Sequence, residues 1–238
     1  MNFFLELNKN EKRVCLYLVF GLIIFFFFDY AISSFFHEIN SQTKSLFSTL
    51  THFGDSLYFF IPTIIIWGGI KIVNSKDKII NSIGDISLFI FFSILLSGVM
   101  AQISKHIIGR PRPILYNGFD IKGLDILNFD SKWHSFPSGH TTTIFAFIFC
   151  LFFLFPKIKN LLITFAIIIA STRVIIGAHF ISDIFGGVIV AFLSTIFVRN
   201  KFLTHNKPFD FLDKISTPTD GFGCVFGYLY GVFWVVFF

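Results

Sequence analysis

Charged side chains are scarce in this sequence of 238 residues. They make up 14% of the chain, against about 25% in a typical soluble domain. Apolar residues make up 54%, Phe alone supplies 38 residues, and the mean hydropathy is +0.75. A water-soluble globule of this length cannot cover so much apolar side chain. The composition therefore excludes a soluble protein and indicates an integral membrane protein.

Cysteines and clustered acids are also few. Cys15, Cys150 and Cys224 lie in apolar runs without the spacing of metal ligands, so neither a disulfide framework nor a zinc site is indicated. No cluster of acidic residues suits another metal, so we expect no metal and no cofactor. The net charge of +5 does not indicate a nucleic-acid partner, because the loops of a membrane protein usually carry excess Lys and Arg.

Long apolar runs dominate the sequence instead. A helix needs about 20 residues to cross about 30 Å of hydrocarbon, and six runs reach or approach that length. They are Val14–Phe36, Leu57–Val73, Ile83–Ser104, Thr141–Phe155, Leu161–Ala178 and Asp183–Val198. We read the first as a retained helix because it has no clear small-residue cleavage site. The sequence predicts an all-α bundle of six transmembrane helices.

The chain shows no internal repeat and no linker, so residues 1–238 are predicted to form a single domain. An apolar tail, 221–238, follows the sixth run, with Gly223, Gly227 and Gly231 at every fourth position. On a helix these glycines would form one smooth stripe for close packing. The tail is either a seventh packed segment or a short interfacial end.

Loop charges predict the orientation. With the N-terminus inside, 12 of the 19 Lys and Arg residues fall on the cytoplasmic side, as the positive-inside rule requires. One outer loop, 105–140, departs from the rule because it holds five cations. We therefore expect these cations to serve a site that faces the periplasm, or the outside of the cell.

The first polar cluster begins that loop. Lys105 ends the third apolar run, and Gly109 and the prolines that follow prevent the helix from continuing. We expect the turn to bring Lys105, Arg110 and Arg112 together. Converging cations form an anion site, and the planar Arg fork suits phosphate. The alternative is an anchor for lipid headgroups.

The second cluster precedes the fourth run. Ser138 is a plausible N-cap, and Gly139 allows backbone to approach a ligand closely. A helix that begins here presents free N–H groups and the positive end of its dipole, which suits phosphate. His140 lies at the same position. The alternative is an ordinary helix cap with an incidental His.

The third cluster joins the fifth and sixth runs. His179 and Asp183 are four residues apart, so on a helical turn they would lie within hydrogen-bond reach. A carboxylate at Nδ1 fixes the tautomer that leaves Nε2 with a free lone pair. Arg173 lies six residues before His179, and Gly177 between them allows the chain to bend.

Together the three clusters resemble the three-part signature of the type 2 phosphatidic acid phosphatase family, which includes membrane lipid phosphatases and vanadium haloperoxidases. The matching segments are Lys105-x6-Arg112-Pro113, Pro137-Ser138-Gly139-His140 and Arg173-x5-His179-x3-Asp183. The resemblance covers residues 57–198. One position departs from the family pattern, since Thr172 stands where the family usually has Ser.

The resemblance implies a role for each matching residue. His179 is the expected nucleophile, Asp183 orients it, and His140 is the general acid and then the base. The expected phosphate-binding groups are Lys105, Arg112, Arg173, Ser138 and the N–H of Gly139. Phosphoryl transfer needs charge neutralisation and an in-line nucleophile, and three fixed cations can supply the former in place of a metal.

The implied substrate is a phosphorylated lipid of a bacterial inner membrane. Its identity stays open among lipid A 1-phosphate, undecaprenyl diphosphate and phosphatidylglycerol phosphate or phosphatidate. Four residues of the outer loop are candidates to contact a sugar or a second phosphate: His106, Lys122, Lys132 and His134. The alternatives are a vanadium haloperoxidase and a non-catalytic carrier or flippase. The sequence does not predict the oligomeric state.

Overall fold

The computed structural model describes residues 7–74, 76 and 78–205. Within these ranges the regular structure is helical, and the only extended pairing is an isolated bridge between Arg110 and His134. The helices are α1 (Lys9–His37), α2 (Ser41–Leu50), α3 (Leu57–Val73), α4 (Lys78–Ile108), α5 (Pro113–Phe119), α6 (Gly139–Leu154), α7 (Lys159–Ile175) and α8 (Ile181–His205). Short 3-10 turns occur at Thr51–Gly54 (η2), Ser131–Trp133 (η3) and Pro156–Ile158 (η4).

The all-helical class is confirmed, and each of the six predicted runs coincides largely with one helix. Among the described residues, four segments are long and apolar enough to cross a membrane: Lys9–His37, Ser41–Val73, Ile80–Ile108 and Ile181–Lys201. Helix α6 is apolar but has 16 residues, and α7 has 17. The count of six spans therefore stays a prediction. The tail 221–238 lies outside the described residues.

Helix α7 ends earlier than the apolar run suggested. The run extended to Ala178, but the helix ends at Ile175. Gly177 adopts a left-handed backbone conformation with φ +72°, which glycine accepts readily and which ends a helix. His179 therefore lies in the connection between α7 and α8 rather than on a helix.

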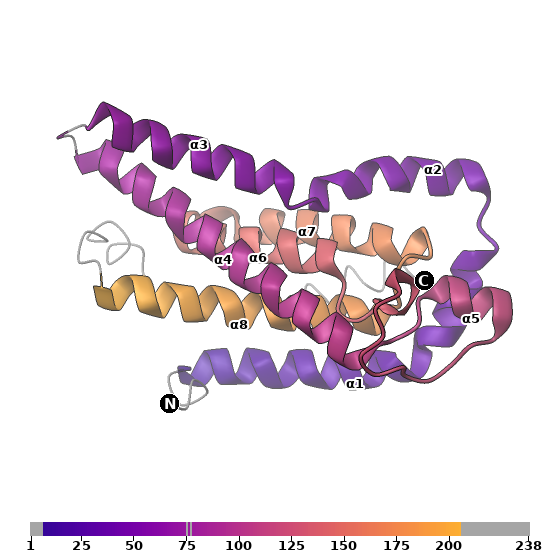
Figure 1. Cartoon of the computed structure of the whole chain (residues 1–238). Coiled ribbons are helices and arrows are strands. Elements are labelled where there is room, and N and C mark those ends of the chain that lie inside the picture. The colour runs from indigo at the N-terminus through magenta and orange to yellow at the C-terminus, as the bar shows by residue number, and fades with distance from the viewer. Residues whose placement is uncertain (1–6, 75, 77, 206–238) are drawn as a thin grey trace.

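Helix α6 forms the centre of the bundle (Figure 1). Most of its residues are buried, including Ile144, Ile148 and Phe149, as expected for a helix that is apolar on all sides. It packs against α4, α7 and α8, while α1 packs on α8 and α3 packs on α4. Figure 1 shows the start of α1, the α3–α4 turn and the end of α8 at one end of the bundle, and α5 at the other.

Two features fix the ends of α1 and α4. At the start of α1, Asn8 and Glu11 form a capping box, and Glu11 also accepts a 2.8 Å bond from Arg199 of α8. At the end of α4, Gly109 has φ +56°, and a Cβ there would lie 1.6 Å from the carbonyl oxygen of Asp125. Only glycine fits this turn, which directs the following segment across the end of the bundle.

Candidate active site

A cavity of about 300 Å³ lies at the end of the bundle where α4 ends and α6 begins. Five of the residues predicted from the sequence line it together: Lys105, Arg112, His140, Arg173 and His179. Gly139 also lines the cavity. These residues come from three separate stretches of the chain, 105–112, 139–140 and 173–179, so the predicted convergence of the three clusters is present in the structure.

Lys105 reaches the cavity from the last turn of α4 and is buried. Its ammonium group lies close to the first residue of α6, because a Cβ on Gly139 would be 3.2 Å from Nζ of Lys105. Glycine at this position keeps the ammonium group close to the beginning of α6. The free N–H groups of that helix and the Lys105 charge therefore act on the same small volume.

The two arginines complete the positive wall. Arg112 donates from Nε to the carbonyl oxygen of Ser131 at 3.0 Å, and burial lowers the pKa of Arg112 from its usual value. Arg173 donates from Nη1 to Thr51 Oγ1 at 3.0 Å. Its Nε is buried without a hydrogen-bond partner among the described residues. An unpaired buried donor is costly, so an anion in the cavity would satisfy it.

His179 faces this wall with a fixed tautomer. Its Nδ1 lies 2.7 Å from the carbonyl oxygen of Ser135, and since a carbonyl only accepts, Nδ1 carries the hydrogen. Nε2 keeps a free lone pair. Burial lowers the pKa of His179 to about 3, so the ring is neutral at physiological pH. A neutral, oriented imidazole is suited to attack a phosphorus atom.

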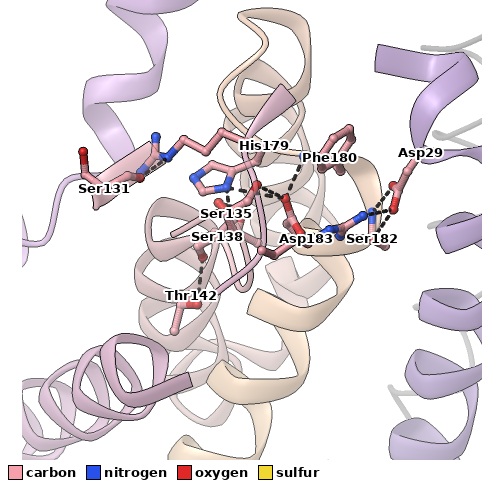
Figure 2. Close-up of polar contacts among 12 residues, drawn as sticks. Asp29, Ser131, Ser135, Ser138, Thr142, His179, Phe180, Ser182 and Asp183 are labelled. Atoms are coloured by element: carbon pink, nitrogen blue, oxygen red, sulfur yellow. Dashed lines mark hydrogen bonds and ion pairs between the residues drawn. The ribbon is translucent and has the colours of Figure 1, made fainter. Parts of the chain in front are cut away.

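The sequence-based expectation for Asp183 needs correction. The Asp183 carboxylate was expected within hydrogen-bond reach of His179, but Oδ2 lies 3.7 Å from Nδ1. Because His179 precedes α8, the four-residue spacing does not place both side chains on one helix face. Ser135 connects the two instead, since its carbonyl accepts from His179 and its Oγ donates to Asp183 Oδ2 at 2.6 Å (Figure 2).

Arg110 also differs from the prediction. It was expected beside Lys105 and Arg112, but its guanidinium forms ion pairs of 2.6 Å with Asp29 and with Asp183. Burial alone would lower the pKa of Arg110, but the charges of Asp183 and Asp29 raise it. The sequence reasoning missed Asp29, although a carboxylate inside an apolar run is itself a signal of function.

His140 lies in the first turn of α6 and opens onto the cavity. It lies against Gly54, where a Cβ would come within 3.0 Å of His140 Cβ. Ser138 is the N-cap by position, but its side chain makes no capping bond and its Oγ accepts from Thr141 Oγ1 at 3.0 Å. Ser138 is buried and is not among the residues that line the cavity.

Other positions singled out in the sequence lie away from the cavity. The hydroxyl of Thr172 donates to the carbonyl oxygen of Ile169 at 2.6 Å, within its own helix. Lys122 pairs with Asp120 at 2.8 Å. The rings of His106 and His134 lie 4.3 Å apart. None of the four outer-loop candidates lines the cavity.

The charged and imidazole side chains of the cavity determine what chemistry it can carry out. No group of three or more His, Cys, Asp or Glu residues in the part of the chain that the structure describes is arranged to hold a metal ion. The cavity combines three cations and two imidazoles with one carboxylate, that of Asp55. Such a set can neutralise the equatorial oxygens of a phosphoryl group and provide a nucleophile and a proton carrier.

Comparison with known proteins agrees with this chemistry. Residues 87–207 match the family model described as the PAP2 superfamily. Two relatives are each named lipid A 1-phosphatase. The one from Rhizobium johnstonii is 30% identical over 74% of this chain and 74% of its own length. The one from Rhizobium etli is 31% identical over 63% of this chain and 67% of its own length.

A solved structure shares the fold. The crystal structure of a transmembrane PAP2 type phosphatidylglycerolphosphate phosphatase from Bacillus subtilis superimposes with a TM-score of 0.58 at 20% sequence identity. The match covers 81% of this chain and 98% of the other. At this identity the likeness concerns the fold alone.

The chain belongs to the PAP2 superfamily. It is a phosphatase with apolar helices suited to a membrane. The family resemblance read from the three sequence motifs is confirmed, and so is the expectation of an enzyme rather than a carrier or flippase.

The positive wall predicts how anions bind. Arg173→Gln should weaken inhibition by orthovanadate about 10- to 100-fold, since a hydrogen bond to a charged group contributes about 1.5–3 kcal/mol. Vanadate reports on the site because it adopts the five-coordinate geometry of the transition state. The control is Lys122→Gln, which removes an exposed cation that does not line the cavity.

Activity without vanadate should be measured separately in buffer that contains EDTA, where we expect full activity. Loss of activity in EDTA that Mg²⁺ restores would contradict an anion site built from Lys105, Arg112 and Arg173. Equal inhibition of the Arg173 variant and the wild type would contradict the role of Arg173.

Proposed function

We propose that this protein hydrolyses a phosphate ester of a membrane lipid, on the outer face of the membrane, through a phosphohistidine intermediate. The observation that carries the proposal is one cavity among the described residues that three cations and two histidines line together. The reaction consumes one water and releases the dephosphorylated lipid and inorganic phosphate.

His179 is the proposed nucleophile. Its Nε2 lone pair attacks phosphorus, the bond to the lipid oxygen breaks, and the ring becomes a phosphorylated imidazolium. The fixed Nδ1–H bond to Ser135 at 2.7 Å and the Asp183 carboxylate at 3.7 Å stabilise the positive charge that the ring then carries.

His140 is the proposed general acid and base. It lies across the same cavity from α6 and opens onto the space that the phosphoryl group would occupy. In the first step it donates a proton to the departing lipid oxygen. In the second step it accepts a proton from the water that attacks phosphohistidine, which returns both histidines to their starting state.

Lys105, Arg112 and Arg173 are the proposed ligands of the phosphoryl oxygens, together with Ser138 and the N–H of Gly139. The unpaired Nε of Arg173 and the closeness of Lys105 to the start of α6 support this assignment. Ser138 would contribute through its place at the N-terminus of α6, because its hydroxyl is buried beside Thr141.

Lipid A 1-phosphate is the proposed substrate. The support comes from the two relatives named lipid A 1-phosphatase, at 30% and 31% identity. The other candidates are undecaprenyl diphosphate, phosphatidylglycerol phosphate and phosphatidate. The named activity of the solved PAP2 structure gives no preference among them, because that likeness concerns the fold alone.

We further propose six membrane spans in the inner membrane, with α6 and α7 as the two short ones. Helix α6 is buried among α4, α7 and α8, so it need not match the full lipid thickness. The loop charges favour the N-terminus inside. In this topology the cavity faces the periplasm, and the substrate belongs to the outer leaflet of the inner membrane.

A substrate panel tests the proposed activity. Purified protein in detergent micelles should release phosphate from lipid A 1-phosphate with the highest kcat/KM. We expect a preference of about tenfold, equal to about 1.4 kcal/mol of transition-state stabilisation. His179→Ala should release none above background, since His179 is the only group that attacks phosphorus in the proposed mechanism.

The outcomes of the panel are distinct. A higher kcat/KM for one of the other lipids would overturn the substrate but leave the phosphatase mechanism. Turnover by His179→Ala at the wild-type rate would overturn the covalent mechanism.

Cysteine labelling tests the sidedness. Leu124 is exposed in the loop 105–140, and Lys76 is exposed in the turn between α3 and α4. In a background that lacks the three native cysteines, Leu124→Cys should react with a membrane-impermeant thiol reagent in spheroplasts, whereas Lys76→Cys should react only after the membrane is opened. The reverse pattern would invert the topology and exclude an outer-leaflet substrate.

A further inference from the structure

A buried charge network connects α1 to the catalytic end of α8. Arg110 donates from Nη1 to Asp183 Oδ1 and from Nη2 to Asp29 Oδ2, both at 2.6 Å. The side chain of Arg110 is 7% exposed, and both carboxylates are fully buried. We call Asp29, Arg110, Ser182 and Asp183 the carboxylate network. Figure 2 shows Asp29 extending from α1 toward Ser182.

Asp29 also holds the beginning of α8. Its Oδ1 accepts from the backbone N–H of Ser182 at 2.9 Å, and its Oδ2 accepts from the Ser182 hydroxyl at 2.5 Å. A carboxylate that binds a free N–H in the first turn acts as an N-cap supplied by another helix. Asp183 is the next residue, so Asp29 fixes the turn from which Asp183 projects.

Arg110 acts on His179 by two routes. Its guanidinium binds Asp183, and its backbone carbonyl accepts from the N–H of Ser135 at 3.0 Å. Ser135 in turn presents its carbonyl to Nδ1 of His179 and its hydroxyl to Asp183. Both acceptors that face Nδ1 therefore depend on the position of Arg110.

The charges explain why the network needs two carboxylates. Arg110 paired with Asp183 alone would form a neutral pair, and little negative charge would act on His179. Asp29 supplies a second negative charge, so the buried group has a net charge of −1. An imidazolium at His179 is stabilised by such a charge and destabilised by the cations across the cavity.

We propose that Arg110 and Asp29 are positioning residues, which hold Asp183 and the Ser135 carbonyl against Nδ1 of His179 and keep a net negative charge there. The inference rests on the proposed role of His179 as nucleophile. Asp29 lies outside the family match, which begins at residue 87, so the contribution of α1 is additional to that matched region.

Two single variants and their combination test the proposal. Arg110→Met leaves two buried carboxylates without their cation, and Asp29→Asn leaves Arg110 and Asp183 as a neutral pair. We expect kcat to fall about 10- to 100-fold in each. This is the range found in metal sites when the groups that orient the metal-binding histidines are removed. The double variant retains the Asp183 charge alone, so its kcat should fall no further than that of Arg110→Met.

Two further measurements separate positioning from substrate binding. Inhibition by inorganic phosphate, which binds as an anion without a bond to His179, should stay within about threefold of wild type in all three variants, because Lys105, Arg112 and Arg173 are untouched; a loss of this size is under about 1 kcal/mol in binding. Arg110→Lys keeps the positive charge but lacks the planar guanidinium that binds Asp183 and Asp29 through separate nitrogens. Its kcat should therefore lie between those of the wild type and Arg110→Met.

The matched control is Glu11→Gln. Glu11 and Arg199 form a largely buried pair of 2.8 Å between the same helices, α1 and α8, at the opposite end of the bundle. This variant should lower thermal stability but leave kcat unchanged. Equal loss of kcat in Glu11→Gln and Asp29→Asn would show a structural role and overturn the proposal.

The remaining outcomes are also decisive. Wild-type kcat in Asp29→Asn and Arg110→Lys, with His179→Ala inactive, would overturn positioning and leave the proposed function intact. Independent, multiplied losses in the double variant would overturn the shared network. Turnover by His179→Ala at the wild-type rate would overturn the covalent mechanism on which the inference rests. If Arg110→Met does not fold, Asp29→Asn and Arg110→Lys decide the question alone.

Discussion

The Asp183 carboxylate is fully buried at the start of α8, and the catalytic end of the bundle is built around it. Removing a charge from water costs several kcal/mol unless partners replace the lost hydration. Arg110, Ser135 and the N–H of Phe180 supply those partners at 2.6, 2.6 and 2.8 Å. Meeting this requirement places the segment after α4, the segment before α6 and the α7–α8 connection beside one another.

His179 lies between two groups of opposite charge. On one side are Asp183 and the Ser135 carbonyl, and on the other are the three cations of the cavity wall. The first side favours positive charge on the ring, and the second attracts the phosphoryl oxygens. In the proposed first step, attack on phosphorus would move positive charge to the imidazole and retain negative charge at the oxygens, so both sides would stabilise its product.

Part of this site could be predicted from the sequence because local rules fix where its helices begin and end, and the roles of its residues were implied by the family resemblance. Gly109 stops α4, which sends Arg112 back toward Lys105, and the Ser138–Gly139 pair begins α6 beside both. The helices followed from the apolar runs. Composition and turn residues act over a few positions, so no long-range contact was needed for these predictions.

The carboxylate network could not be predicted in this way. Arg110 and Asp29 are 81 residues apart in sequence, and Ser182 and Asp29 are 153 apart. Whether Arg110 lies beside Lys105 and Arg112 or pairs with a buried acid depends on how α1 packs on α8. The predicted hydrogen bond between His179 and Asp183 was wrong for a related reason. Residues four apart face each other on a helix, but His179 lies before α8 begins.

The stereochemistry at phosphorus tests the covalent mechanism most directly. A substrate whose phosphorus is made chiral with oxygen isotopes and sulfur would be hydrolysed in isotopically labelled water, and the configuration of the released thiophosphate determined. Two in-line displacements, first by His179 and then by water, predict overall retention. Inversion would show a single displacement by water and contradict the account.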